Sequence, residues 1–321
     1  MLLDVRDLRV SFAKDGETTD VIRGVSFSLE KGERAALVGE SGCGKSLTSL
    51  SLTRLPPTNR AIISGEIRFK GRPLTGPHPK IAYIFQDPIA SLNPVMRIGR
   101  QLREACEAAR TDPGTIAELL ESVDLRDPQG ILRSYPCELS GGMCQRVMIA
   151  MGLARHPELL VADEPTTALD VTTQADVMDL VVRLVKERGM ALLMATHNLG
   201  LVAGRCDTAH VLYAGQIVES GPVRDVIGNP LHPYAKGLVA AVPRIEDGRG
   251  NQLRDIPGTV PSPREIAALT AAEDGVSCAF RPRCPYATPA CEKNISMSTN
   301  GNRSVRCARF LPHAIPKESQ T

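Results

Sequence analysis

The order of apolar and polar positions along the chain follows two different periods. Short apolar or alternating runs of the kind that form strands recur through the first two hundred residues. Between them, apolar residues recur at the spacing of helices that bury one face. The expected strands are residues 3–12, 21–29, 34–38, 65–71, 81–85, 159–164 and 190–195. The expected helices are residues 47–52, 143–155 and 171–188, with a helical insertion at 97–133 inside a helical subdomain of about 95–155.

Two of these strands are apolar throughout and stop abruptly at polar residues. One ends at Asp163 and Glu164, and the other is followed by Thr196 and His197. Strands that alternate with helices are typical of an α/β fold with a parallel sheet, whose strands all end at one edge. The sequence therefore predicts an α/β protein with its functional site along that edge.

The segment between residues 34–38 and 47–52 matches the phosphate-binding pattern G-x-x-x-x-G-K-S/T at every fixed position. Its glycines allow successive backbone N–H groups to face an anion at a helix N-terminus. Lys45 is expected to reach the β- and γ-phosphates of a nucleotide, and Ser46 to bind Mg²⁺. The expected nucleotide-binding residues of this loop are Gly39, Glu40, Ser41, Gly42, Cys43, Gly44, Lys45 and Ser46.

The two carboxylates after the strand 159–164 take different roles beside such a loop. Asp163 is expected to hold Mg²⁺ through water, and Glu164 to orient and deprotonate an attacking water. A second glycine-rich turn, residues 139–146, begins the expected helix 143–155 and offers another anion-binding end. Cys43 lies at a helix N-terminus near Lys45, so we expect a reactive thiolate that MgATP protects from alkylation.

Composition narrows the class of protein. The 321 residues suffice for about two domains, and no apolar run approaches the length that spans a bilayer. The first residues carry charges where a signal peptide needs an apolar core, so a cytoplasmic chain is expected. A net charge of +2 and 3% aromatic residues argue against a dedicated nucleic-acid surface.

Together these motifs resemble the ATP-binding subunit of an ABC transporter, over nearly all of the chain up to about residue 240. The resemblance implies a P-loop NTPase fold in which Glu164 is the catalytic base, His197 the switch histidine and Gln86 a catalytic glutamine. It also implies that Mg²⁺ is held by Ser46, Gln86 and Asp163. Asn198 follows His197 where the family usually carries Asp, which leaves the fixing of this loop open.

The same resemblance implies a dimer of two ATPase subunits, because the signature turn, residues 139–145, would contact nucleotide bound to a partner's phosphate loop. A D-loop would lie at residues 168–170. Phe12 would stack on adenine, although a core-packing role fits this ring equally well. The further ATP-binding residues implied are Phe12, Ser140, Gly141, Gly142, Gln145 and Asp170.

Residues 85–94, 232–234 and 282–285 narrow the resemblance to the dipeptide, oligopeptide and nickel importers, and within them to the dipeptide type. This implies an ATP-hydrolysing subunit at the cytoplasmic face of the membrane that works with a homologous second ATPase, two permeases and an external binding protein. Nickel, a metal chelate or another small solute is an alternative cargo. A soluble ABC ATPase acting on nucleic acid or the ribosome is an alternative from another class, which the lack of a second cassette or long coiled insertion disfavours. A metal-cluster regulatory protein is disfavoured by the intact Glu164.

The composition changes near residue 243, so we expect an ATPase domain at 1–242 and a small loop-rich module at 243–321. The four cysteines of this module are separated by five, six and fifteen residues, without a C-x-x-C pair, which is weak evidence for zinc. The resemblance implies a 4Fe–4S cluster on them, with zinc and free thiols as the alternatives. These cysteines are Cys278, Cys284, Cys291 and Cys307.

Overall fold

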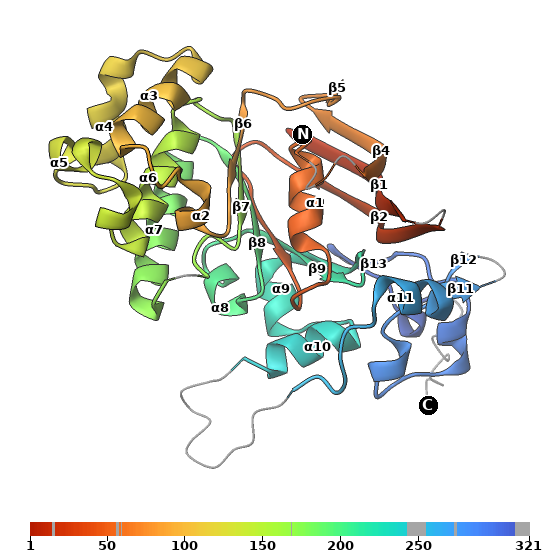
Figure 1. The fold of residues 1–321 in the computed structure, drawn as a ribbon. Helices are drawn as coiled ribbons and strands as arrows, with labels where there is room; N and C mark the ends of the chain where they lie inside the picture. Colours follow the sequence, from red (N-terminus) through yellow and green to blue (C-terminus); the bar gives the residue numbers. More distant parts are fainter. Residues whose placement is uncertain are drawn as a thin grey trace, which may run out of the picture.

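The computed structural model describes residues 1–14, 17–55, 58, 60–167, 169–242, 255–272 and 275–311. An antiparallel sheet near the N-terminus, red and orange in Figure 1, has the strand order β2-β1-β4-β5. Strands β1 and β2 extend beyond the expected ranges, because their polar ends still pair with each other. The bounds are Leu3–Lys14 for β1, Glu17–Leu29 for β2, Ala61–Phe69 for β4 and Arg72–Pro73 for β5.

The larger sheet has the order β13-β14-β10-β9-β3-β8-β7-β6. Strands β6, β7, β8, β3 and β9 run parallel, which confirms the predicted α/β fold, and antiparallel strands complete one edge. The central bounds are Arg34–Val38 for β3, Ile81–Ile84 for β6, Leu159–Asp163 for β7 and Ala191–Thr196 for β8. The edge bounds are Thr208–Tyr213 for β9, Gln216–Pro222 for β10, Ser298–Asn300 for β13 and Arg303–Val305 for β14.

Alternate residues of the central strands supply two hydrophobic cores, one on each face of this sheet. In β3, Ala36 and Val38 belong to the core beneath the helices, whereas Ala35 and Leu37 face the antiparallel sheet. The helix after the phosphate loop, α1 (Lys45–Leu52), packs into the second core through Leu52. The fold is therefore layered. Strand β3 lies between the two cores, and the phosphate loop follows its carboxyl end.

Helices gather on one side of the large sheet, in yellow and green in Figure 1. Their apolar faces meet in the first core, as the helical spacing of the sequence predicts. Within the described ranges, no helix is both long and apolar enough to cross a membrane. The bounds are Pro88–Ser91 for α2, Ile98–Ala109 for α3, Ile116–Ser122 for α4, Pro128–Arg133 for α5, Gly141–Leu153 for α6, Val171–Glu187 for α7, Leu199–Val202 for α8, Val223–Gly228 for α9 and Pro233–Ala240 for α10.

The C-terminal segment is joined to the ATPase part through the large sheet. Strand β14 pairs with β10, with Val305 opposite Glu219, and β13 pairs with β14. Helix α11 (Pro263–Thr270) lies against β2 and leads to the hairpin of β11 (Ala271–Ala272) and β12 (Gly275–Val276). The remaining short 3₁₀ turns of this segment are Arg281–Arg283, Pro289–Glu292 and Ala308–Phe310.

Two buried histidines contribute to the packing of this edge. The Nδ1 of His210 lies 2.8 Å from the hydroxyl of Ser220. The Nδ1 of His232 accepts the backbone N–H of Tyr234 at 3.1 Å, which caps α10. Burial lowers the pKa of His210 to about 4 and that of His232 to about 3. Both rings are therefore neutral in the folded chain at physiological pH.

These pKa values predict a loss of stability on mild acidification. Below a pH of about 6.5 the unfolded chain binds protons at both histidines and the folded chain does not, so stability falls as pH falls. Between about pH 7 and about pH 5 each histidine should cost about 2 kcal/mol of the free energy of unfolding. Urea unfolding of His210→Gln over this range should show a dependence on pH that is weaker by this amount. A variant with the wild-type pH dependence would contradict the assignment.

Candidate functional site

The phosphate loop leaves β3 at Val38 and enters α1 at Lys45, as the sequence predicts. Gly39 is required because a Cβ at this position would lie 2.3 Å from the carbonyl oxygen of Leu212. Gly44, the N-cap of α1, has a φ of 107°, which L side chains rarely adopt. The turn around the loop therefore depends on these two glycines.

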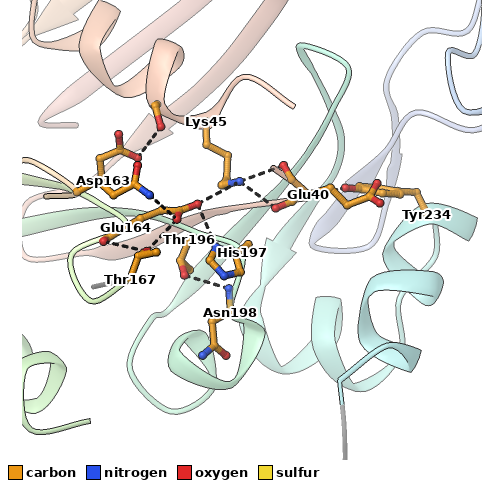
Figure 2. A network of polar contacts seen from close by, with 12 residues as sticks. Glu40, Lys45, Asp163, Glu164, Thr167, Thr196, His197, Asn198 and Tyr234 are labelled. Atoms are coloured by element: carbon orange, nitrogen blue, oxygen red, sulfur yellow. Dashed lines mark hydrogen bonds and ion pairs between the residues drawn. The ribbon is translucent and has the colours of Figure 1, made fainter. Parts of the chain in front are cut away.

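The side chain of Lys45 lies inside the loop and is only 4% exposed. Its Nζ donates to the carbonyl oxygens of Gly39 at 3.0 Å and Glu40 at 3.1 Å, as Figure 2 shows. It also lies 3.6 Å from Oε1 of Glu164. A buried ammonium that is hydrogen-bonded to backbone carbonyls can exchange these bonds for stronger ones to phosphate oxygens.

A hydroxyl and a carboxylate converge at the start of α1 and the end of β7. The Oγ of Ser46 donates to Oδ1 of Asp163 at 3.0 Å, and the hydroxyl of Tyr83 donates to Oδ2 at 2.9 Å. Burial raises the pKa of Asp163, partly offset by these two hydrogen bonds. Oxygen donors of this kind suit Mg²⁺, so these residues fit that ion. Tyr83 is a site residue that the sequence analysis missed, and no motif marks it.

Glu164 is the point at which side chains from several elements meet (Figure 2). Its carboxylate lies 3.1 Å from Nδ1 of His197, which follows β8. It accepts from the hydroxyl of Thr167 at 2.9 Å and from Nε2 of Gln86 at 3.3 Å. The backbone of Glu164 has a φ of 43°, an unusual conformation for a residue with a side chain.

The surroundings keep the Glu164 carboxylate ionised. Burial raises its pKa, but the hydrogen bonds from His197 and Thr167 outweigh burial. The nearby charge of Lys45 acts in the same direction, so the pKa lies below its ordinary value. Gln86 was expected among the Mg²⁺ ligands. In the described structure its side chain donates a hydrogen bond to the carboxylate of Glu164 and none to Asp163.

Asn198 fixes the loop that carries His197. Its side-chain oxygen accepts the backbone N–H of Gly200 at 3.0 Å and so caps α8. Its own N–H donates to the hydroxyl of Thr196 at 3.0 Å. An amide oxygen caps a helix as well as a carboxylate does, which answers the question that the sequence left open.

The second glycine-rich turn, residues 139–146, begins α6, on the other face of the large sheet from α1. Ser140 caps α6, with its Oγ accepting the N–H of Met143 at 3.3 Å, and Gly141 and Gly142 form the first turn. Helix α6 packs into the core beneath the helices, whereas α1 packs into the core on the opposite face of the sheet. The two anion-binding ends therefore lie on different layers of one chain.

The remaining expected nucleotide residues are placed as follows. Phe12 lies half-buried on β1 and packs against the second core. This position is compatible with packing in the core and with stacking on adenine. Gln145 is fully buried in α6. Asp170 caps α7 through the N–H of Thr173 at 3.0 Å, and Ala168 lies outside the described residues.

The expectation of a reactive thiolate at Cys43 is wrong. The side chain is only 1% exposed, and burial raises the pKa of the thiol to about 11 although Lys45 lowers it. The desolvation of a thiolate in this position outweighs the helix dipole and the lysine charge.

We therefore expect slow alkylation of Cys43. Treatment of the folded chain with iodoacetamide, followed by mass spectrometry, should label the exposed Cys137 at least tenfold faster. A Cys137→Ser variant is the control that removes the fast site. Rapid labelling of Cys43 that MgATP suppresses would restore the sequence-based expectation.

The tail cysteines share one small neighbourhood. Cys291 and Cys307 are buried, Cys278 and Cys284 are partly buried, and the N–H of Cys278 donates to the carbonyl of Cys291 at 3.0 Å. In the part of the chain that the structure describes, no group of three or more His, Cys, Asp or Glu side chains is placed to hold a metal ion. The described structure therefore gives no support to the expected 4Fe–4S cluster.

Two further residues, whose roles no sequence motif indicated, bind the phosphate loop from outside. The hydroxyl of Tyr234 accepts the backbone N–H of Glu40 at 2.8 Å, as Figure 2 shows. The guanidinium of Arg283 binds the carboxylate of Glu40. Both belong to segments that the sequence singled out, residues 232–234 and 282–285, without indicating that they meet at the loop.

Comparison with known proteins agrees with this geometry. A family model described as ABC transporter matches residues 22–167. A second, described as Oligopeptide/dipeptide transporter, C-terminal region, matches residues 218–291. In fold, the chain is similar to cbiO1 from Clostridium perfringens, with a TM-score of 0.60 and 24% identity over 71% of this chain and 91% of that one.

Two relatives are similar over almost the whole length. A protein of Sinorhizobium fredii with the name "Probable peptide ABC transporter ATP-binding protein y4tR" is 45% identical over 92% of this chain and 90% of its own. The oligopeptide transport ATP-binding protein OppD of Salmonella typhimurium is 44% identical over 91% of this chain and 88% of its own. The chain therefore belongs to the ATP-binding subunits of peptide-importing ABC transporters, and its ATPase activity energises peptide import.

Proposed function

We propose that Glu164 is the general base of ATP hydrolysis. The convergence of His197, Thr167 and Gln86 on its carboxylate carries this proposal. An ionised carboxylate can take a proton from water, and its lowered pKa keeps it in that state at physiological pH. His197 would hold the attacking water and the developing charge in line with the phosphate bound by Lys45.

The loop from Gly39 to Ser46 binds the phosphates of ATP in this proposal, with Lys45 moving from the Gly39 and Glu40 carbonyls to phosphate oxygens. Ser46 and Asp163 would hold Mg²⁺, which supplies charge neutralisation on the phosphates. Gln86 would sense the nucleotide from Glu164. Phe12 would stack on the adenine, and Asp170 would act from the cap of α7.

The site is completed by a second, homologous ATPase subunit. The cap of α6 and the phosphate loop lie on different layers of one chain, so Ser140, Gly141 and Gly142 are available to the nucleotide of a partner. An exposed N–H-rich helix end suits a γ-phosphate. The other partners would be two permeases and an external binding protein, with the chain peripheral at the cytoplasmic face of the membrane and without nucleic acid.

Domain organisation follows the same division. The ATPase domain would cover residues 1–242, with its helical subdomain at about 95–155, and the C-terminal module residues 243–321. The gathering of α3 to α6 on one side of the large sheet supports the helical subdomain. The start of the module lies among residues that the structure does not describe.

The imported solutes are di- and oligopeptides in this proposal. Uptake of labelled dipeptide, a longer peptide and nickel should be compared in the native organism after Glu164→Gln replaces the wild-type chain. Peptide uptake should be lost and nickel uptake kept. Glu158→Gln is the matched control, because Glu158 precedes the same strand and pairs with Lys70 at 2.9 Å. Selective loss of nickel uptake would assign the chain to metal import instead.

A metal centre on the tail cysteines is a separate proposal. The four thiols are those of Cys278, Cys284, Cys291 and Cys307. The N–H of Cys278 donates to the carbonyl of Cys291, and Cys278 packs against the small hydrophobic cluster that contains Cys291. Backbone amides two residues further along also lower the pKa of three of these thiols, although burial outweighs them. Four thiolates are the ligand set of a 4Fe–4S cluster. Anaerobically purified protein should contain iron and acid-labile sulfide; zinc alone, or no metal, would refute the cluster.

A further inference from the structure

An ion pair joins the C-terminal segment to the phosphate loop. Nη1 and Nη2 of Arg283 donate to Oε2 and Oε1 of Glu40, both at 2.9 Å. The arginine side chain is 5% exposed and the glutamate side chain 29%. Two parallel hydrogen bonds from a planar guanidinium fix the carboxylate in both position and orientation.

Arg283 is itself held firmly from the C-terminal side. Its Nε donates to the carbonyl of Pro257 at 2.8 Å, and Nη2 also reaches the carbonyls of Ile256 at 3.2 Å and Gly258 at 3.1 Å. The guanidinium lies 5.9 Å from the ring of Phe280. Since lysine cannot make these bonds together, the site requires the fork of an arginine.

Glu40 is held at three points. Its side chain binds Arg283, its N–H donates to Tyr234, and its carbonyl accepts from Lys45. The N–H that Tyr234 takes is no longer free to turn toward a ligand, so the orientation of this peptide is fixed. The conformation of the loop is therefore determined partly by α10 and by the C-terminal segment.

The charge of Glu40 makes this contact important for nucleotide binding. A carboxylate in a loop that binds a polyanion repels its ligand, and the repulsion is strong where water is excluded. Arg283 cancels this charge with two direct hydrogen bonds. No motif of the loop itself supplies such a cation, because Lys45 points to the loop interior.

We propose that Arg283 is a positioning and charge-compensating residue, through which the C-terminal segment sets the affinity of the phosphate loop for nucleotide. The inference rests on the proposed role of this loop in ATP binding. Arg283 acts only through Glu40 and does not touch the nucleotide. Tyr234 acts in the same way on the backbone of Glu40.

The affinity of the full chain for mant-ATP in the presence of Mg²⁺ tests this inference. Arg283→Met should raise the Kd about tenfold, because it leaves the charge of Glu40 uncompensated. The Arg283→Met, Glu40→Gln double variant should return the Kd to within about threefold of wild type, since the repelling charge is gone. In ATPase assays, Arg283→Met should affect KM more than kcat.

Arg281→Met is the matched control, because Arg281 lies in the same 3₁₀ turn and faces Glu292 at 3.9 Å. It should leave the Kd within about twofold of wild type. Thermal unfolding shows whether Arg283→Met is folded. If it is not, Arg283→Lys and Tyr234→Phe take its place, each with an expected rise of about threefold in Kd.

Two results would overturn the inference. One is an unchanged Kd in a folded Arg283 variant. The other is a raised Kd that Glu40→Gln does not restore, which would mean that the arginine only supports the fold of the tail. Absence of mant-ATP binding by the wild-type chain would instead refute the proposed role of the phosphate loop.

Discussion

Replacement of Glu164 by glutamine should lower the ATPase rate of the assembled transporter by about a hundredfold to ten-thousandfold, the usual contribution of a general base. The amide has the same shape and keeps the contacts with Thr167 and His197, but it cannot accept a proton from water. ATP binding should therefore persist while turnover stops. Phosphate release under multiple turnover and nucleotide retention after rapid gel filtration measure the two properties.

Glu158→Gln is the control for this experiment. Glu158 lies directly before β7, whereas Glu164 lies directly after it, so both changes neutralise a carboxylate at an end of the same strand. The control should keep the wild-type rate, because the carboxylate of Glu158 pairs with Lys70 at the opposite end of β7 from Glu164. A Glu164→Gln variant that hydrolyses ATP at a near-wild-type rate would show that another group deprotonates the water.

Replacement of Phe280 by alanine should lower the free energy of unfolding by about 3 to 5 kcal/mol. The ring is 2% exposed, with its centroid 5.2 Å from that of Tyr213 and 5.4 Å from that of Tyr234. These tyrosines belong to β9 and α10, so the aromatic contacts dock the C-terminal segment onto the ATPase part. Urea-induced unfolding followed by circular dichroism measures the loss.

The comparison for Phe280 is Tyr286, an aromatic residue of the same segment that is 50% exposed. Its ring contacts only the guanidinium of Arg309, at 4.8 Å, among the ring contacts of the described residues. Tyr286→Ala should therefore cost less than about 1 kcal/mol. Equal losses for the two variants would mean that the Phe280 ring does not dock the segment.

The motifs and the parallel core of this protein can be predicted from its sequence. The phosphate loop requires glycines at positions 39 and 44 and a lysine at 45, and these needs are local, so a linear pattern reveals them. The apolar runs that end at Asp163 and before Thr196 likewise placed the site at the carboxyl edge of the sheet. Periodicity was enough here because each signal lies within a few residues.

The way in which distant segments act on these motifs depends on tertiary packing. Burial raises the pKa of Cys43, whereas the sequence pattern predicted a lowered one. Desolvation depends on packing that a sequence pattern does not encode. The hydrogen bond of Tyr83 to Asp163 and the pairing of Arg283 with Glu40 join residues 80 and 243 positions apart. Such contacts depend on where strands and turns meet in space, and each alone leaves no periodic or motif signal in the sequence.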